Sequence, residues 1–219
     1  MINIAKSQPA PDCLELEKRK KNGDYGCGEV RDRLQVDFFN KCYICEEKAP
    51  SSIVIEHFLA HGGDVELKFD WNNLFFACTH CNNVKHSYFN DILNCTDFTE
   101  IITDCIQFHF DPFPEERIFL IGEKTISKAQ KTIELLEKVY NGKTTHQIME
   151  ANNIRIKLRT EISNFLDAIE DYQHSRQEKY QLKLKQMLSP ESAFTAFKIW
   201  IIKKNPDLIG ELGDLLPHF

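Results

Sequence analysis

CYIC at residues 42–45 and CTHC at residues 78–81 are the two segments around which this chain of 219 residues is organised. Each segment separates its two cysteines by two residues, so that one tight turn can aim both sulfurs at a single ion. Four thiolates suit a tetrahedral zinc ion, with Zn–S bonds of about 2.3 Å, and they leave no open position for water or substrate. We therefore predict a structural Zn²⁺ that takes the place of a large apolar core; its ligands are Cys42, Cys45, Cys78 and Cys81.

The other four cysteines lack this spacing. They stand alone in the sequence, at Cys13, Cys27, Cys95 and Cys105. Free cysteines behave as small buried hydrophobic residues. We therefore expect these four to be packed thiols, without disulfide bonds.

The segments around the cysteine pairs predict an α+β fold that is mainly helical. Between the pairs, short β-branched runs and turn residues replace helical periodicity, as in a small ββα unit held by a metal. Strand-like runs at 105–110 and 117–121 follow, separated by a turn at 111–114, and helical patterns cover 127–141, 144–188 and 193–204. We divide the chain into an N-terminal tail with helices (1–40), a core (41–122) and a C-terminal helical region (123–219).

Composition limits the classes of protein that the chain can belong to. Its 42% hydrophobic and 27% charged residues are ordinary for a soluble globular protein. No stretch approaches the roughly 18 apolar residues of a membrane span, and residues 1–12 do not resemble a signal peptide. We expect a cytoplasmic protein that has no membrane partner. The net charge of −6 is unfavourable for phosphate binding, so a nucleic-acid ligand would require a local basic patch or a partner protein.

Polar residues around the cysteine pairs carry a second pattern. An acid–histidine pair, Glu56-His57, ends a β-branched run; Asn73 precedes the second cysteine pair, and Asn82 and Lys85 follow it. This arrangement resembles the HNH endonuclease family, in the branch that carries two CxxC pairs. The matching segments are CYIC, then IEH, then WNNLFFACTHCNNVK.

The resemblance implies a ββα-metal nuclease core with a role for each polar residue. An imidazole titrates near neutral pH, so His57 fits the general base that activates water. Glu56 and Asn82 offer the oxygen ligands that suit a catalytic Mg²⁺ or Mn²⁺. Asn73 matches the asparagine that orients the histidine by hydrogen bonding, and Lys85 would contact a phosphate as a point charge.

The resemblance also extends outside the core. Segments 6–11, 40–46, 111–112 and 192–197 resemble the PtuB family of HNH subunits from Septu and retron anti-phage defence systems. Members of that family work beside an ABC/SMC-type ATPase of the PtuA kind. The resemblance therefore implies DNA as the substrate and such an ATPase as the partner, which would supply the DNA-binding surface that an acidic chain lacks.

Two alternatives remain open at this point. A zinc-organised binding module would use the same cysteines without any catalysis. An HNH nuclease could also act on RNA, for instance tRNA, because the site acts on the phosphodiester and reads little of the sugar.

Overall fold

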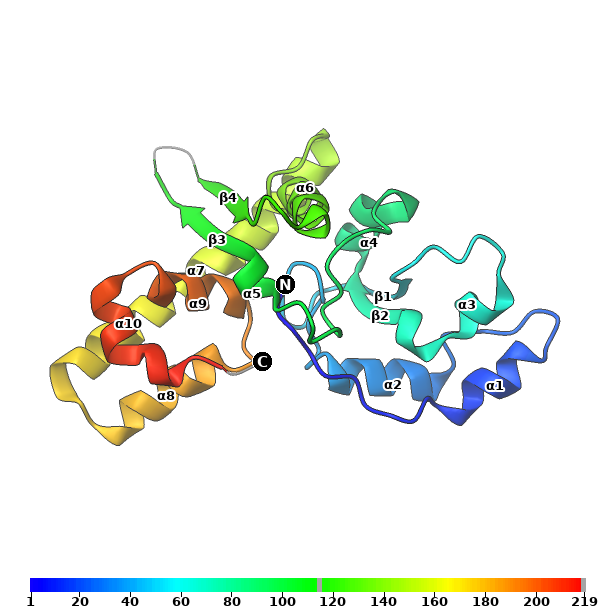
Figure 1. Ribbon diagram of the computed structural model, residues 1–219, viewed down its shortest axis with the longest axis horizontal. Helices are drawn as coiled ribbons and strands as arrows, with labels where there is room; N and C mark the ends of the chain where they lie inside the picture. Colours follow the sequence, from blue (N-terminus) through cyan, green and yellow to red (C-terminus); the bar gives the residue numbers. More distant parts are fainter. Residues whose placement is uncertain (114–115, 218–219) are drawn as a thin grey trace.

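The chain folds as an α+β protein in which two small antiparallel sheets are surrounded by helices (Figure 1). The computed structural model describes residues 1–113 and 116–217. The N-terminal residues run into two short helices, α1 (Asp12–Lys18) and α2 (Gly28–Asp37). The predicted mainly helical α+β class is therefore confirmed.

A ββα unit lies at the centre of the cysteine-containing segment. Its strands are β1 (Ile53–His57) and β2 (Leu74–Cys78), and its helix is α4 (Thr79–Lys85). The strands pair antiparallel, with Ile53 opposite Cys78 and His57 opposite Leu74. Their connection contains the short helix α3 (Val65–Phe69) and a 3₁₀ turn, η1 (Trp71–Asn73); a second 3₁₀ turn, η2 (His86–Tyr88), follows α4.

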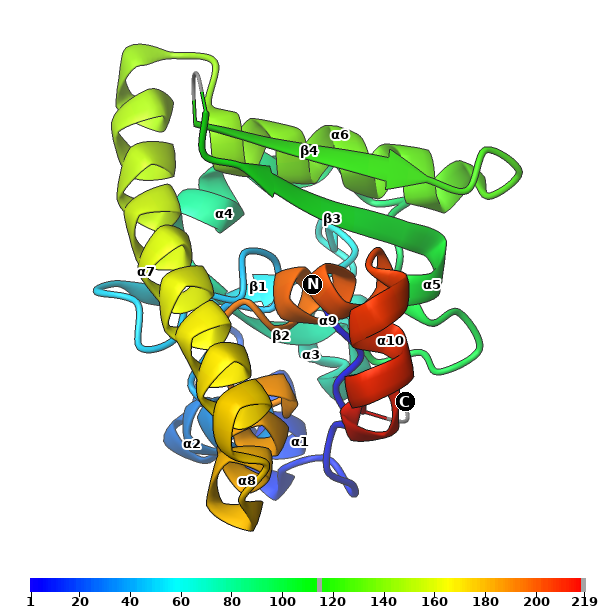
Figure 2. The ribbon, with the colours of Figure 1, turned by 90° about the vertical axis from the view of Figure 1, so that its left-hand side faces the viewer.

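The second sheet is a hairpin of β3 (Ile106–Asp111) and β4 (Arg117–Gly122), which follows a one-turn helix, α5 (Ile102–Cys105). Along β4, Ile118 and Leu120 are buried whereas Phe119 and Ile121 are exposed, as expected for a strand with one covered face. Helix α6 (Ser127–Asn141) runs beside this hairpin (Figure 2). The predicted turn at 111–114 lies between the strands, but its Pro114 is outside the described residues.

The C-terminal region contains more helices than the sequence pattern predicts. The pattern at 144–188 predicts one continuous helix, and the structure contradicts this: α7 (Thr145–Ser175) ends at Arg176, and α8 (Glu178–Leu188) then begins. Arg176 adopts a left-handed conformation, with φ 51°, which reverses the chain so that α8 packs against α7. Two further helices follow, α9 (Thr195–Lys203) and α10 (Pro206–Leu212), and then a 3₁₀ turn, η3 (Gly213–Leu215).

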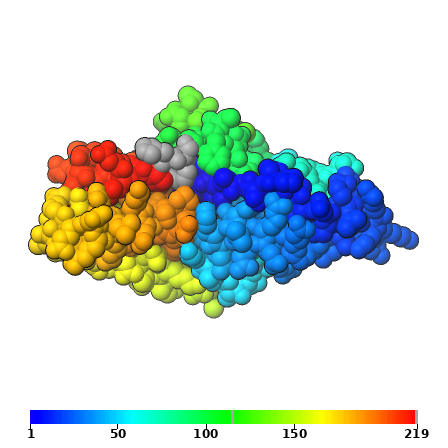
Figure 3. Space-filling view, turned by 90° about the horizontal axis from the view of Figure 1, so that it is seen from below, coloured from blue at the N-terminus to red at the C-terminus, as the bar shows by residue number. Residues whose placement is uncertain are grey.

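The buried apolar side chains form two clusters. The larger cluster runs from Met1 and Ile2 through the ββα unit to Phe194 and Phe197, so it crosses both segment boundaries drawn from the sequence. The smaller cluster joins the second half of α7 to α8, α9 and α10. Figure 3 shows the face on which the N-terminal residues adjoin the C-terminal helices.

One expectation about the cysteines is wrong. Cys13, at the start of α1, forms a disulfide with Cys27, the residue before α2, whereas Cys95 and Cys105 are buried free thiols as expected. The spacing of 14 residues gave no indication of the pairing, because it depends on how the chain returns between the two helices.

None of the helices within residues 1–113 and 116–217 has the length and apolarity that crossing a membrane would require.

Candidate functional site

The four paired cysteines come together as the sequence predicts. Cys42 and Cys45 lie in the loop after α2, Cys78 ends β2, and Cys81 lies in the first turn of α4; all four are buried. Their sulfur atoms all lie within 4.8 Å of one another, and the sulfurs of Cys45 and Cys78 are 3.9 Å apart. A tetrahedral zinc ion with bonds of about 2.3 Å requires sulfurs about 3.8 Å apart. The four thiols are therefore a candidate zinc site, and their geometry fits the ion.

The local backbone explains why the sulfurs converge. In the first pair, the amide of Glu46 donates to the carbonyl oxygen of Cys42 at 2.9 Å, and Glu46 takes a positive φ of 59° that closes the turn. In the second pair, Cys78 is the N-cap residue of α4, and its sulfur accepts from the amide of Cys81 at 3.4 Å. The two turns are joined because the amide of Tyr43 donates to the carbonyl of Phe76 on β2.

Burial also opposes the ionisation of three of the four thiols. It raises the pKa of the Cys45 and Cys81 thiols well above the ordinary value of 9.0. Burial opposes the ionisation of Cys42 as well, but hydrogen bonds from the three neighbouring thiols lower its pKa. Four buried thiolates cannot share such a small volume unless a metal ion balances their charge, so zinc binding would be coupled to the release of protons.

A buried ionic group supports the first cysteine turn from behind. The Glu46 carboxylate accepts a hydrogen bond from the amino group of Met1 at 2.9 Å and lies 3.6 Å from the ammonium group of Lys41. It also accepts from the backbone amide of Ala196, at the start of α9. The cysteine turn is thus attached both to the first residue and to a C-terminal helix.

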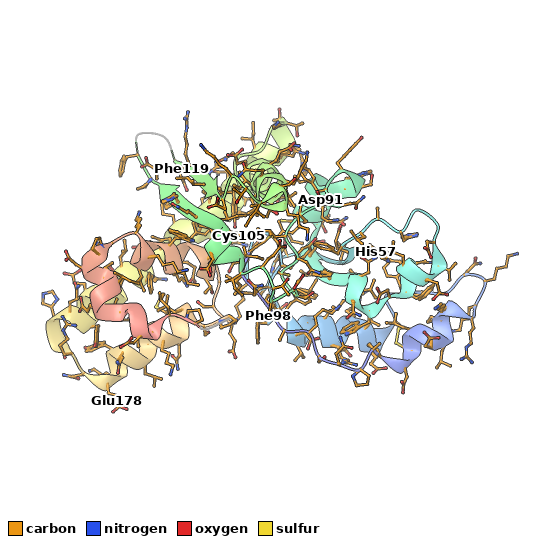
Figure 4. The ribbon with its side chains drawn as sticks, in the orientation of Figure 1. His57, Asp91, Phe98, Cys105, Phe119 and Glu178 are labelled. Carbon is orange, nitrogen blue, oxygen red and sulfur yellow. A yellow bond between two sulfur atoms is a disulfide. The ribbon has the colours of Figure 1, made fainter. Side chains whose placement is uncertain are left out.

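His57 is half-buried at the end of β1 (Figure 4). Its Nε2 lies 3.0 Å from the carbonyl oxygen of Lys68 in α3. A carbonyl oxygen only accepts, so Nε2 carries the proton and Nδ1 keeps a free lone pair. Burial, as the main cause, lowers the pKa of His57 below 6.5, even though the bond to Lys68 acts in the opposite direction. In its neutral form, His57 would therefore present the free Nδ1 lone pair that a general base requires.

Two aromatic rings lie against His57. The ring centroid of Tyr25, from the loop between α1 and α2, is 4.5 Å away, and that of His61 is 4.8 Å away. His61 follows His57 closely in the sequence, whereas nothing in the sequence indicated Tyr25, which lies far from β1 in the chain. The contribution of Lys68 was also hidden, because its backbone carbonyl makes the contact and every residue type has one.

Asn73 has a different set of partners from the one implied by the resemblance. Its side chain accepts from the amide of Leu59 at 2.7 Å and donates to the carbonyls of Leu59 and Leu67, both at 3.0 Å. The amide thus ties the loop after β1 to α3. Its effect on His57 is indirect, since it fixes the turn of helix whose next carbonyl, that of Lys68, holds the imidazole.

Lys85, expected to contact a phosphate, is instead buried in an ion pair. Lys85 is only 1% exposed, and its ammonium group donates to the Glu56 carboxylate at 2.8 Å and to the carbonyl of His57 at 3.1 Å. Glu56 and His57 are adjacent on β1, so their side chains leave opposite faces of the strand. Glu56 therefore faces α4, and a buried ion pair holds Lys85 away from solvent.

Glu56 and Asn82, the two candidate ligands of a divalent cation, differ in their burial and in their hydrogen bonds. One carboxylate oxygen of Glu56 is bound by Lys85, and the other, Oε2, is buried without a hydrogen-bond partner. Burial raises the pKa of Glu56, and the positive charge of Lys85 acts against that rise. Asn82 lies one turn before Lys85 on α4 and is half-buried. Magnesium usually keeps several water ligands, and the unpaired oxygen of Glu56 is buried, so the described residues do not show a site for such an ion; the half-buried Asn82 is the more accessible of the two residues.

A separate recess lies at the other side of α4. It has a volume of about 500 Å³, and its lining includes Cys78, His80, Asn83, His146 and Lys157. His57, Glu56 and Asn73 are not part of this lining, so the recess and the histidine cluster are distinct places on the molecule.

No model of a known protein family matches this chain, and a comparison of its sequence with curated proteins finds no match either.

Proposed function

We propose that this protein is a metal-dependent HNH endonuclease that cleaves phosphodiester bonds in DNA. The observation that carries the proposal is the state of His57, whose Nε2 is tied to the Lys68 carbonyl while Nδ1 is free. The histidine ends the first strand of a ββα unit whose second strand and helix supply two of the candidate zinc ligands.

Each residue has a chemical role in this proposal. Nδ1 of His57 takes a proton from the water that attacks phosphorus, and the resulting imidazolium is stabilised by its bond to the Lys68 carbonyl. The proposal assigns Mg²⁺ or Mn²⁺ to Glu56 and Asn82, and it requires the Glu56 carboxylate to turn from Lys85 toward the His57 side of β1. The ion would stabilise the negative charge that develops on the phosphate oxygens. Asn73 acts as a positioning residue through α3. Lys85 keeps the Glu56 carboxylate in place, and its charge competes with the divalent cation for that carboxylate.

The proposal includes a partner ATPase of the ABC/SMC type and a role in anti-phage defence, both on the basis of the sequence resemblance to the PtuB family. The net charge of −6 supports a partner that supplies a basic surface for DNA. Helix α7 exposes large apolar side chains, among them Ile148, Met149, Ile156 and Leu166, which fit a protein-binding face.

One observation favours the second candidate function, a zinc-organised binding module without catalysis. The Glu56–Lys85 ion pair already neutralises the carboxylate, and a module that only presents a surface would have no need of a divalent cation beside it.

The test is cleavage of supercoiled plasmid in the presence of Mg²⁺ or Mn²⁺, with and without the presumed ATPase. His57→Ala is compared with His174→Ala, which removes an exposed histidine at the end of α7. We expect wild type and His174→Ala to cut, and His57→Ala to lose at least about 100-fold in rate, which is the usual contribution of a general base. Equal cleavage by all three would refute the role of His57.

A tRNA substrate, tested in parallel, separates the two nuclease alternatives. If zinc-loaded, folded wild type leaves plasmid and tRNA intact with the ATPase and either metal ion present, the binding module is the correct interpretation.

A further inference from the structure

The loop between α1 and α2 is closed at its base by the Cys13–Cys27 disulfide. Both cysteines are half-buried, so a reductant can reach them. Figure 1 shows this loop beside α3, at the end of the molecule that carries the ββα unit.

Close backbone contacts hold the loop in one conformation. A Cβ on Gly23 would lie 1.9 Å from the carbonyl oxygen of Glu17 and 3.1 Å from the ring of Phe69, so only glycine fits there. The Glu17 carboxylate accepts from the amide of Asp24 at 3.0 Å, and a Cβ on Gly26 would come within 3.3 Å of Ile55 on β1. The loop therefore packs against both α3 and β1.

Through this packing the loop reaches His57. The Tyr25 ring, two residues before Cys27, meets the His57 ring edge-on at 4.5 Å. Lys68 connects the same parts: its ammonium group donates to the carbonyl of Gly23 at 3.3 Å, while its own carbonyl accepts from His57. The loop and α3 thus enclose the imidazole from two sides.

We propose that Tyr25 is a positioning residue for His57 and that the Cys13–Cys27 disulfide controls it, so that the surroundings of His57 depend on the thiol redox state. Reduction breaks the S–S bond with two electrons and two protons from a dithiol, which itself becomes a disulfide. The control follows from the arrangement of rings and loop, whether or not the chain is a nuclease.

Helix α1 is short, and this explains why the Cys13–Cys27 disulfide contributes to holding the loop in place. Helix α1 has only seven residues, and isolated helices of that length are not stable in water. Apart from Leu14, which is buried, α1 has mostly polar or exposed side chains, so little apolar burial supports it beside the covalent link to Cys27 and the Lys18–Glu66 ion pair with α3. In a reducing compartment, disulfides of this kind are usually transient and often sense redox state.

The test records the imidazole signals of His57 by NMR in the zinc-loaded protein, at a pH well above the pKa values of its histidines. His57→Gln assigns these signals. We compare the oxidised wild type, the wild type reduced with a dithiol, Tyr25→Ala and Tyr25→Phe. Intact mass verifies the state of the disulfide, and zinc content verifies that the four-cysteine site stays loaded. We expect reduction and Tyr25→Ala to move the His57 signals in the same direction, because both remove the ring from the imidazole. Tyr25→Phe keeps the ring and leaves them near their oxidised positions.

Chemical modification gives a second readout. We expect acylation of His57 by diethyl pyrocarbonate to become several-fold faster on reduction and in Tyr25→Ala. The Cys13→Ser/Cys27→Ser double variant should behave like the reduced protein, and Cys105→Ser, which removes a free thiol elsewhere, like the oxidised one. If the double variant does not fold, the reduced wild type decides alone.

Two results would overturn the proposal. His57 signals and acylation that do not change on verified reduction would show that the disulfide has no control over the site. Signals that do not change in Tyr25→Ala would show that Tyr25 does not position the histidine.

Discussion

The cysteine-containing segment from Lys41 to Phe89 and the helical segment from Thr145 to Leu212 are stabilised in different ways. The first has no regular element longer than the seven residues of α4 and is organised by four thiols and buried polar contacts. The second contains the 31-residue helix α7, and its buried side chains are mainly apolar, apart from Thr195 and Lys198. Short elements need specific cross-links, whereas long amphipathic helices are stabilised by the apolar stripe that they bury.

The two segments also differ in how their polar side chains are held. Specific polar contacts hold His57, Glu56 and Lys85 in fixed positions, and all of them lie in the first segment. In the second segment the polar side chains mainly face solvent or form ion pairs at the surface, such as Lys183 with Asp171. The predictions that follow are ordered from the largest expected effect to the smallest.

Removal of zinc is expected to have the largest effect, and this effect should differ between the two segments. Cys78→Ser, or chelation of zinc, is expected to abolish protection of backbone amides in residues 41–89, because structural zinc contributes about 10 kcal/mol to folding in small zinc domains. Hydrogen exchange measured by mass spectrometry reads both segments in one sample. We expect protection to persist in α7 and α8, and Cys105→Ser to leave the whole pattern unchanged. Uniform loss over the chain would show that the helices depend on the metal as well.

Loss of the Glu46 charge should be the next largest effect. Glu46→Gln keeps the size of the side chain but leaves the amino group of Met1 and the ammonium of Lys41 buried without their counter-charge. We expect a loss of about 4 kcal/mol in the free energy of unfolding, since one half of a buried ion pair is then uncompensated. Urea unfolding measures it, with the exposed Glu191→Gln as control. Equal midpoints for both variants would mean that this ionic group does not stabilise the fold.

Shortening one buried side chain in the helical segment should lower the free energy of unfolding by somewhat less than the change at Glu46. Leu184 is fully buried in the second cluster, whereas Leu182, on the same helix, is 55% exposed. Leu184→Ala is expected to lower the free energy of unfolding by about 3 kcal/mol through the lost burial and the cavity. The same change at Leu182 should cost less than about 0.5 kcal/mol. Similar losses at the two positions would contradict the packing of α8 described above.

The smallest effect concerns pH and depends on the proposed nuclease activity. Burial lowers the pKa of His57, and a general base works in its neutral form. Activity should therefore fall as pH decreases through the lowered pKa, and the midpoint of this acidic limb should lie below the ordinary histidine value of 6.5. The rate of plasmid cleavage as a function of pH measures it. A midpoint above 6.5 would point to another group as the base.

Spacing in the sequence was enough to predict the parts that depend on local geometry. Each CxxC spacing predicted two converging sulfurs, and the β-branched run before His57 predicted β1, because both follow from contacts within a few residues. The meeting of the two pairs, 33 residues apart at Cys45 and Cys78, was predicted from the four ligands that zinc requires. Helix α6 ends at Asn141 before Gly142, as the sequence indicates, since glycine readily takes the positive φ of 70° found there.

Long-range contacts explain what the sequence did not predict. Lysine is normally exposed, and Lys85 is buried only because Glu56, on a strand far earlier in the chain, faces it. Arg176 ends α7 in a left-handed conformation that is unusual for arginine, so no local signal marked the break. The disulfide and the Tyr25–His57 contact both require the loop after α1 to fold back, and neither follows from spacing.

The attachment of Glu46 has a consequence for the order in which the protein is made. All four candidate zinc ligands leave the ribosome before α6, but the loop that carries the first two is completed only when Phe194 and Ala196 arrive, because their amides donate to the Glu46 backbone and side chain. A nascent chain that has not reached α9 therefore keeps an acidic side chain and open backbone groups beside its metal site. The contacts of the first cysteine turn are therefore completed late in synthesis, after all four cysteines have been made.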